Sequence, residues 1–62
     1  MNYGELKRKL KAAGCYKIDE GKRHERWYSP ETGQEFPVGR HNQQEVATGT
    51  LKSIGNAAGI KL

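Results

Sequence analysis

Apolar residues change their spacing along this 62-residue chain, and the change restricts the folds that the chain can adopt. Near the start, an apolar stripe at helical spacing is formed by Tyr3, Leu6, Leu10 and Ala13. In the middle, apolar and polar residues alternate, as they do in half-buried strands. Helical spacing then returns before the C-terminus. The sequence therefore predicts a helix, several strands and a second helix.

The first helix is predicted over residues 3–13. Asn2 can cap its N-terminus, and Glu5 three residues later completes a capping-box pattern. Gly14 follows the last apolar residue of the stripe and suits a left-handed C-terminal cap. These signals place both ends of the helix.

The second helix is predicted to begin near Thr48, an acceptable N-cap, and to end at Gly59. Its apolar stripe consists of Leu51, Ile54 and Ala57 or Ala58. Gly55 inside this helix costs about 1 kcal/mol relative to alanine. Such a glycine indicates either close packing against another element or simple tolerance, and the sequence leaves both open.

Three segments between the helices are predicted to be strands: residues 15–19, 23–28 and 34–38. Glycine and proline residues indicate turns at 20–22 and 29–33. In the first strand, Tyr16 and Ile18 alternate with polar residues and are expected to be half-buried. Pro37 cannot donate to a sheet ladder, so it predicts an edge position for the third strand.

The central strand is predicted to present two different faces. One face carries His24, Arg26 and Tyr28, and the other carries Arg23, Glu25 and Trp27. Trp27 is the largest apolar group of the segment and is expected to face the core. His24 would then point outward.

A three-stranded antiparallel sheet with both helices on one face would bury Trp27 together with the two helical stripes. The predicted fold is therefore a single α+β domain over residues 1–62, with the order α-β-β-β-α. This order is also that of the double-stranded RNA-binding domain, so analogy at the level of the fold points toward RNA.

The net charge of +4 favours an anionic partner, such as nucleic acid, an acidic protein or a membrane surface. Ordinary solubility explains the same charge. Cys15 is the single cysteine and is expected in the core, so neither a disulfide nor a cysteine-based metal site is predicted. A lone thiol and the lack of a signal peptide or membrane-spanning run fit a cytoplasmic location.

His24 is the central candidate for chemistry, with Lys22, Arg23 and Arg26 nearby. Cleavage of RNA without a metal needs a base for the ribose 2′-hydroxyl, cations for the phosphate charge, and an acid for the 5′-oxygen. Histidine titrates near neutral pH and serves as base or acid. From its spacing alone, an ordinary exposed histidine is the more frequent case.

The other polar residues each have two interpretations. His41 is a catalytic partner for His24 or a residue that stabilises its loop, and no ligand spacing predicts a metal site. Tyr28 stacks on a base or is simply exposed. Residues 48–50 offer N–H groups to a phosphate, although helix capping is the default role. Five further cations belong to an RNA-binding surface or are merely solvated: Lys7, Arg8, Lys9, Lys11 and Lys17.

A more specific pattern fills the second half of the chain. Its spacing is His-x3-Glu-x3-Gly-Thr-Leu-x2-Ile-x3-Ala-Gly-Ile, from His41 to Ile60. This pattern resembles the C-terminal signature of the HicA toxins, small RNA-cleaving proteins of bacterial toxin–antitoxin pairs. The spacing from Gly14 to His24 and the run His24-x2-Trp27-x2-Pro30 also resemble the family, so the likeness covers essentially the whole chain.

The resemblance maps His24 onto the catalytic histidine of the family, which follows a Gly-Ser pair on the second strand. This chain has Lys22 and Arg23 in place of that pair, with Gly21 one position earlier. Gly39 stands where the family often has proline. The first departure bears on how closely RNA can approach, although two more cations near a phosphate are not unfavourable.

The resemblance implies the toxin of a type II toxin–antitoxin system, a metal-independent endoribonuclease that cleaves mRNA and needs no cofactor. It implies His24 as general acid or base. The RNA-binding residues are expected from their position near His24 in the sequence, and they are Lys22, Arg23, Arg26 and Tyr28. The expected partner is a HicB-like antitoxin that masks the His24 face. The alternative is a non-catalytic RNA-binding module, and a third hypothesis is a domain that binds an acidic protein.

Overall fold

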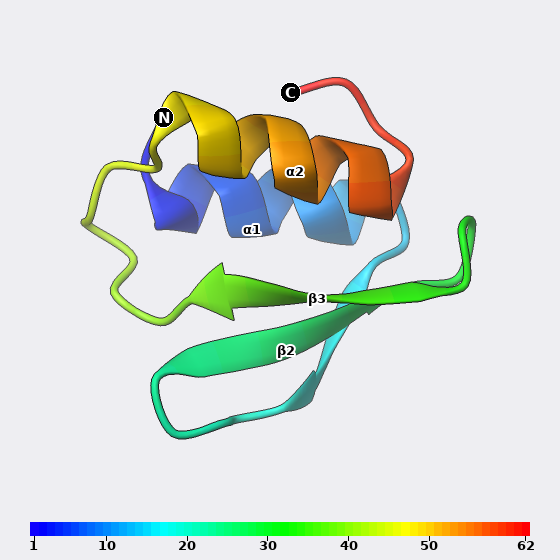
Figure 1. Ribbon diagram of the computed structural model, residues 1–62, viewed down its shortest axis with the longest axis horizontal. Helices are drawn as coiled ribbons and strands as arrows, with labels where there is room; N and C mark the ends of the chain where they lie inside the picture. The colour runs from blue at the N-terminus through cyan, green and yellow to red at the C-terminus, as the bar shows by residue number, and fades with distance from the viewer.

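The computed structural model describes residues 1–62 and has the predicted order of elements. The elements are α1 (Tyr3–Ala12), β1 (Tyr16–Asp19), β2 (His24–Ser29), β3 (Gln34–Gly39) and α2 (Thr48–Ala58). The strands form one antiparallel sheet in the order β1-β2-β3, and both helices lie side by side on the same face of it (Figure 1). The predicted α-β-β-β-α fold is confirmed. Neither helix has the length and apolar content that a bilayer-spanning segment needs.

Helix α1 begins at Tyr3, as predicted, and ends at Ala12, one residue before the predicted end. The Asn2 side chain accepts a hydrogen bond from the Glu5 backbone N–H at 2.9 Å, as an N-cap does. Ala13 is the C-terminal cap, and Gly14 follows it with a φ of 93°. Leu6 and Leu10 point into the core and are fully buried. The capping and periodicity signals were therefore sufficient here.

The expected cap of α2 is wrong. Thr48 is the first helical residue, and Ala47 occupies the cap position, where no side chain satisfies the free N–H groups. At the other end, Gly59 adopts the expected left-handed conformation, with a φ of 76°. Gly55 is explained by close packing, because a Cβ atom there would lie 3.0 Å from the Ile60 carbonyl oxygen. The chain after α2 folds back on this glycine.

A small core lies between the helices and the sheet. Trp27 is only 2% exposed and sits at its centre, facing the helices as predicted. Cys15 is buried with it, which confirms its expected place. The full set of buried apolar residues is Leu6, Leu10, Cys15, Trp27, Phe36, Val38, Val46, Ile54 and Ala58. Because Trp27 faces inward and side chains alternate along a strand, His24, Arg26 and Tyr28 lie on the outer face of the sheet.

The expected burial of β1 is wrong. Tyr16 is 49% exposed and Ile18 44% exposed. Tyr16 pairs with Tyr28 and therefore lies on the outer face of the sheet, which neither helix covers. The register also shifts: Lys17 pairs with Trp27, and Asp19 pairs with Arg26, so Ile18 has no partner on β2. This bulge carries Asp19 to the side of the sheet on which Arg26 lies.

The N-terminal segment is bound along the loop that precedes α2. The backbone N–H groups of Tyr3 and Gly4 donate to the carbonyls of Gln44 and Asn42, and Val46 donates to the Met1 carbonyl. The Met1 ammonium group also pairs with the Glu45 carboxylate. This seam fixes α1 against a part of the chain that is distant in sequence.

Candidate active site on the outer face of the sheet

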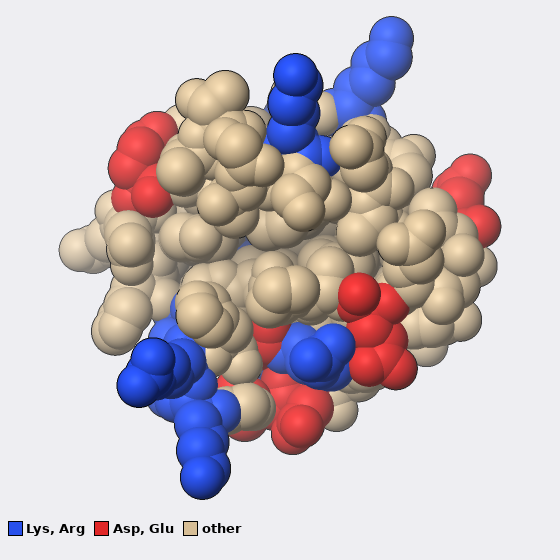
Figure 2. Space-filling model, in the orientation of Figure 1, with Lys and Arg blue, Asp and Glu red and all other residues tan.

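His24 lies on the outer face of β2, away from the helices, as the alternation predicted. It borders a shallow hollow of about 360 Å³, here called the His24 hollow. The hollow is lined by Asp19, Gly21, Lys22, Arg23, His24, Glu25, Arg26 and Pro37. Figure 2 shows blue Lys and Arg side chains at the end of the molecule where Figure 1 places the β1–β2 turn. Four of the proposed site residues are therefore neighbours in space.

The turn that carries Lys22 and Arg23 has a fixed backbone. Gly21 has a φ of 56°, and a Cβ atom built there would lie 2.1 Å from the His24 carbonyl oxygen. No other residue fits this position without moving the backbone. Gly21 therefore lets the turn fold closely over the start of β2.

Arg40 holds the same turn from the neighbouring strand end. Its guanidinium Nη2 donates hydrogen bonds to the backbone carbonyls of Glu20 at 3.0 Å and Gly21 at 2.5 Å. No local pattern in the sequence indicates this role, because the two segments meet only through the pairing of β2 with β3. Arg40 is thus a support of the site that the motif analysis missed.

Glu25 anchors the underside of β2, opposite His24. Its carboxylate accepts hydrogen bonds from Trp27 Nε1 at 2.9 Å and from Lys7 Nζ at 3.1 Å. Desolvation raises the pKa of Glu25, but these two hydrogen bonds and the charge of Lys7 outweigh it, so the pKa lies below its ordinary value. Lys7 also donates to Asn42 Oδ1 at 2.7 Å. Lys7 therefore belongs to the framework rather than to an RNA-binding surface.

The cations near His24 differ in how free they are. Lys22 and Arg23 are exposed and form no ion pair. Arg26 Nη1 lies 3.6 Å from Glu35 Oε1, an exposed pair that contributes little to stability. Lys17 pairs with Glu20 beside the turn. Lys22 and Arg23 are therefore the cations most available to a phosphate group.

Other candidates lie away from the hollow. The three remaining cations of α1, which are Arg8, Lys9 and Lys11, lie in the helix layer and not on the sheet face that carries His24. His41 is exposed in the loop after β3, where its carbonyl accepts a hydrogen bond from the Gln44 N–H, and it does not line the hollow. Tyr28 lies on the same face as His24 but farther along β2. Asp19 does line the hollow, and only the bulge at Ile18 brings it there.

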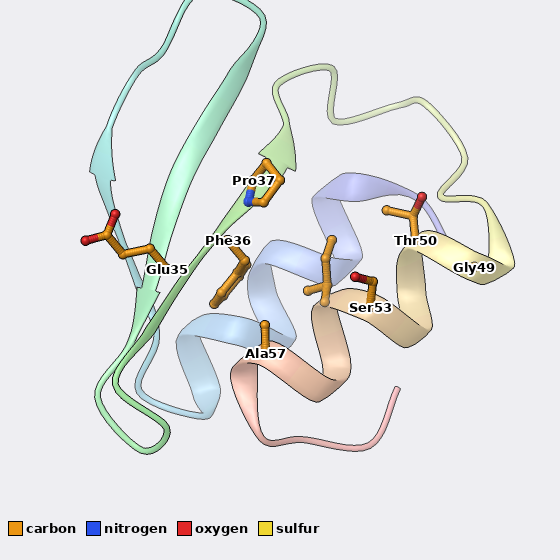
Figure 3. A pocket seen from close by; sticks show the side chains of 8 residues that line it. Glu35, Phe36, Pro37, Gly49, Thr50, Ser53 and Ala57 are labelled. Atoms are coloured by element: carbon orange, nitrogen blue, oxygen red, sulfur yellow. The ribbon is translucent and has the colours of Figure 1, made fainter.

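A larger hollow of about 440 Å³ lies between α2 and the edge strand β3 (Figure 3). It is lined by Glu35, Phe36, Pro37, Gly49, Thr50, Ser53, Ile54 and Ala57. Thr50 and Ser53 contribute hydroxyl groups from α2, but Glu35 is the only ionisable side chain in the lining, and it points away from both hydroxyls (Figure 3). The smaller His24 hollow is the one with chemically useful groups. No group of three or more His, Cys, Asp or Glu side chains is arranged to hold a metal ion.

Comparison with known proteins yields one family. The family described as the HicA toxin of bacterial toxin–antitoxin systems matches residues 3–60, which is nearly the whole chain. The chain belongs to the HicA toxin family. This membership supports a toxin role and implies an antitoxin partner of the HicB type. No curated protein and no solved structure matches the chain.

The glycines at the two departures from the usual HicA pattern, Gly21 and Gly39, each have a structural reason. The glycine before the histidine is displaced to Gly21, where the close approach to the His24 carbonyl requires it. At Gly39, a Cβ atom would lie 2.8 Å from Cζ of Tyr3. The Tyr3 ring thus fills the space that a larger residue at position 39 would occupy. In this HicA protein, Gly21 and Gly39 are matched by local packing partners, and nothing in the structure explains Lys22 and Arg23.

Proposed function

We propose that this HicA-family toxin is an endoribonuclease that cleaves mRNA without a metal ion, with His24 as its general base or general acid. The observation that supports the proposal is the position of His24. It is exposed on the outer face of β2, beside two cations without ion pairs, on a strand anchored from beneath by Trp27 and Glu25. A rigid strand holds a catalytic group more accurately than a loop does.

The reaction is a transesterification within the RNA. The 2′-hydroxyl loses its proton and its oxygen bonds to the adjacent phosphorus, while the bond from phosphorus to the 5′-oxygen breaks and that oxygen gains a proton. The products carry a 2′,3′-cyclic phosphate and a 5′-hydroxyl. An imidazole on this face can accept the first proton or donate the second. Lys22 and Arg23, with Arg26, stabilise the charge on the phosphate oxygens.

The proposal is tested with the substitution His24→Ala in the full chain. Cleavage of RNA and arrest of growth should be lost, while the thermal midpoint changes little because the side chain is exposed. Trp27→Ala is the matched contrast and should lower stability by about 3–5 kcal/mol. A His24→Ala protein that still cuts RNA at a rate near that of the unaltered protein would show that another group carries the chemistry. RNA binding without cleavage by the unaltered protein would favour a non-catalytic binding module.

A HicB-type antitoxin is proposed to cover the same face. The outer face offers exposed cations around His24, so an inhibitor that blocks it is expected to present acidic side chains there. With an interface of ordinary size, about 800 Å² on each partner, the antitoxin would cover a large part of so small a protein. Direct occlusion of His24 is therefore the simplest form of inhibition.

A further inference from the structure

The outer face of the sheet holds an aromatic pair that the proposed chemistry does not use. Trp27 and Phe36 are buried in the core, and Tyr3 packs against it. The other two aromatic residues of the chain, Tyr16 and Tyr28, occupy directly opposite positions on β1 and β2. Their ring centroids are 5.7 Å apart, with an angle of 58° between the ring planes.

Resting on the proposed function, we propose that Tyr16 and Tyr28 form a nucleobase-binding subsite, and that the toxin therefore acts on single-stranded RNA. The face of an aromatic ring attracts any base, because every base has a π-face. In a duplex, both faces of each base are already stacked on neighbours. Only a nucleotide in a single-stranded segment can place its base on the tyrosine pair.

The geometry suits this role in two ways. The two rings contact each other, so each is already restricted before a base arrives and little conformational freedom is lost on binding. Nearly half of the Tyr16 side chain is nevertheless exposed, so a π-face remains available. An isolated exposed tyrosine would have the surface without this restriction.

The pair also lies in line with the catalytic residues. Alternation along β2 places His24, Arg26 and Tyr28 in a row on the outer face. Tyr28 lies four positions after His24, which is about 13 Å along β2. A phosphate at His24 and a base on Tyr28 thus belong to nucleotides that are not adjacent. Arg26 lies between them, where its weak pairing with Glu35 leaves it free to exchange partners for the intervening phosphate.

The apolar core of a protein interface fits the tyrosine pair and its surroundings less well than a base does. The apolar residues there are Tyr16, Ile18, Tyr28 and Pro37, and charged residues interrupt them at Arg26 and Glu35. The core of a stable protein interface is depleted of charge. Aromatic rings interleaved with cations are instead typical of surfaces that bind single-stranded nucleic acid.

The test combines variants of the protein with abasic RNA. The cleavage position in a single-stranded RNA is mapped first, and a 2′-deoxy residue is then placed there so that binding is measured without cleavage. Single abasic nucleotides are introduced at each flanking position. At one position beyond the immediate neighbours, the loss of the base should weaken binding to the unaltered protein roughly 5- to 150-fold. Tyr28→Ala should weaken binding to the intact RNA by a similar factor.

The decisive result is the combination of the two changes. With Tyr28→Ala or Tyr16→Ala, the same abasic substitution should have no further effect, and the preference for single strands over a duplex of the same sequence should shrink. Tyr16→Phe keeps the ring and should behave like the unaltered protein. Ile18→Ala, which removes an exposed apolar side chain from the same strand, is the control for general loss of apolar surface and should change affinity less than twofold. Thermal midpoints exclude unfolding.

Several outcomes would overturn the subsite. Abasic positions that weaken binding equally in the unaltered and Ala proteins would show that the base is bound elsewhere. Tyrosine variants that bind every RNA normally but lose the antitoxin would make the pair a protein interface. In both cases the unaltered protein still cleaves RNA, so the ribonuclease proposal stands. If the unaltered protein neither binds nor cleaves RNA, the proposed function fails and the subsite fails with it.

Discussion

Lys7 on α1 lies 3.1 Å from Glu25 on β2, and the two side chains are only 12% and 13% exposed. This ion pair joins the first helix to the strand that carries His24. The same carboxylate also accepts a hydrogen bond from Trp27, so both oxygens of Glu25 are used. Burial of this carboxylate costs solvation free energy, and the ammonium group of Lys7 and the N–H group of Trp27 offset that cost.

The first prediction concerns the removal of this charge. Glu25→Gln keeps an oxygen for Trp27 Nε1 but leaves the nearly buried Lys7 ammonium without a counter-charge. The free energy of unfolding should fall by about 2–3 kcal/mol, measured by urea denaturation. Lys52→Ala, at an exposed site on α2, is a control that should change it by less than 0.5 kcal/mol. Equal stability of both variants would mean that the pair contributes nothing.

The second prediction concerns pH. The pKa of Glu25 is lower in the folded protein than in the unfolded chain, so the unfolded chain binds this proton more readily. The stabilisation from Glu25 should be complete above about pH 4.3, the ordinary glutamate pKa, and should decline as the pH falls through the lower folded pKa. Thermal midpoints from pH 7 to pH 2 test this. The Glu25→Gln protein should lose less stability over the acidic part of that range than the unaltered protein does.

The third prediction concerns Arg40, which bonds the β1–β2 turn. Arg40→Ala removes two hydrogen bonds to backbone carbonyls, so Lys22 and Arg23 should lose their fixed position beside His24. We expect kcat/KM for RNA cleavage to fall about tenfold, with a loss of stability of only about 1 kcal/mol. Arg40→Lys can still donate to a carbonyl and should recover part of the rate. A fall in rate that only follows the unfolded fraction would contradict the positioning role.

The fourth prediction concerns the products and the role of metals. Cleavage should continue in excess chelator, because no cluster of ligands is arranged to hold a metal ion. Mass spectrometry of the fragments should find 2′,3′-cyclic phosphate and 5′-hydroxyl ends. An RNA with a single 2′-deoxy residue at the cleaved position should resist cleavage there. Cutting of an all-DNA strand, or complete inhibition by EDTA, would exclude the proposed mechanism.

The fifth prediction concerns the antitoxin. In a complex with the protein encoded beside the toxin gene, the amides of residues 22–28 should exchange more slowly, because the partner covers them. Association should become slower as salt increases, since charge steers the encounter. Helix α1 serves as the internal control, because its amides should exchange as fast in the complex as in the free toxin. Protection confined to the helices, with residues 22–28 unchanged, would point to inhibition from a distance.

Local patterns in the sequence were enough to predict the elements and the orientation of β2. Asn2 and Gly14 mark the ends of α1, and Trp27 is large enough to decide which side of β2 faces the core. The position of His24 follows from that choice alone. These inferences needed only near neighbours in the chain.

Features that depend on contacts between distant segments could not be predicted. The bulge at Ile18 reverses the alternation and brings Asp19 to the His24 hollow, although nothing in residues 15–19 indicates an extra residue. Lys7 looks like any solvated lysine on a helix until Glu25 is placed beside it. Ser29 was predicted to lie in a turn, but it ends β2 and is buried, with its hydroxyl donating to the Ala58 carbonyl at 2.9 Å. Tertiary partners decide each of these cases.

The seam between the N-terminal segment and the loop before α2 affects the order in which this toxin folds during its synthesis. Tyr3 and Gly4 find their backbone partners in Gln44 and Asn42, which are synthesised long after them. A nascent chain that already displays His24 and its hairpin still lacks the residues that seat α1, and contacts this distant in sequence form late. Helix α1 therefore takes its place behind β2 only when most of the chain has left the ribosome. An interrupted round of translation should release a fragment in which the strand that carries His24 lacks this support.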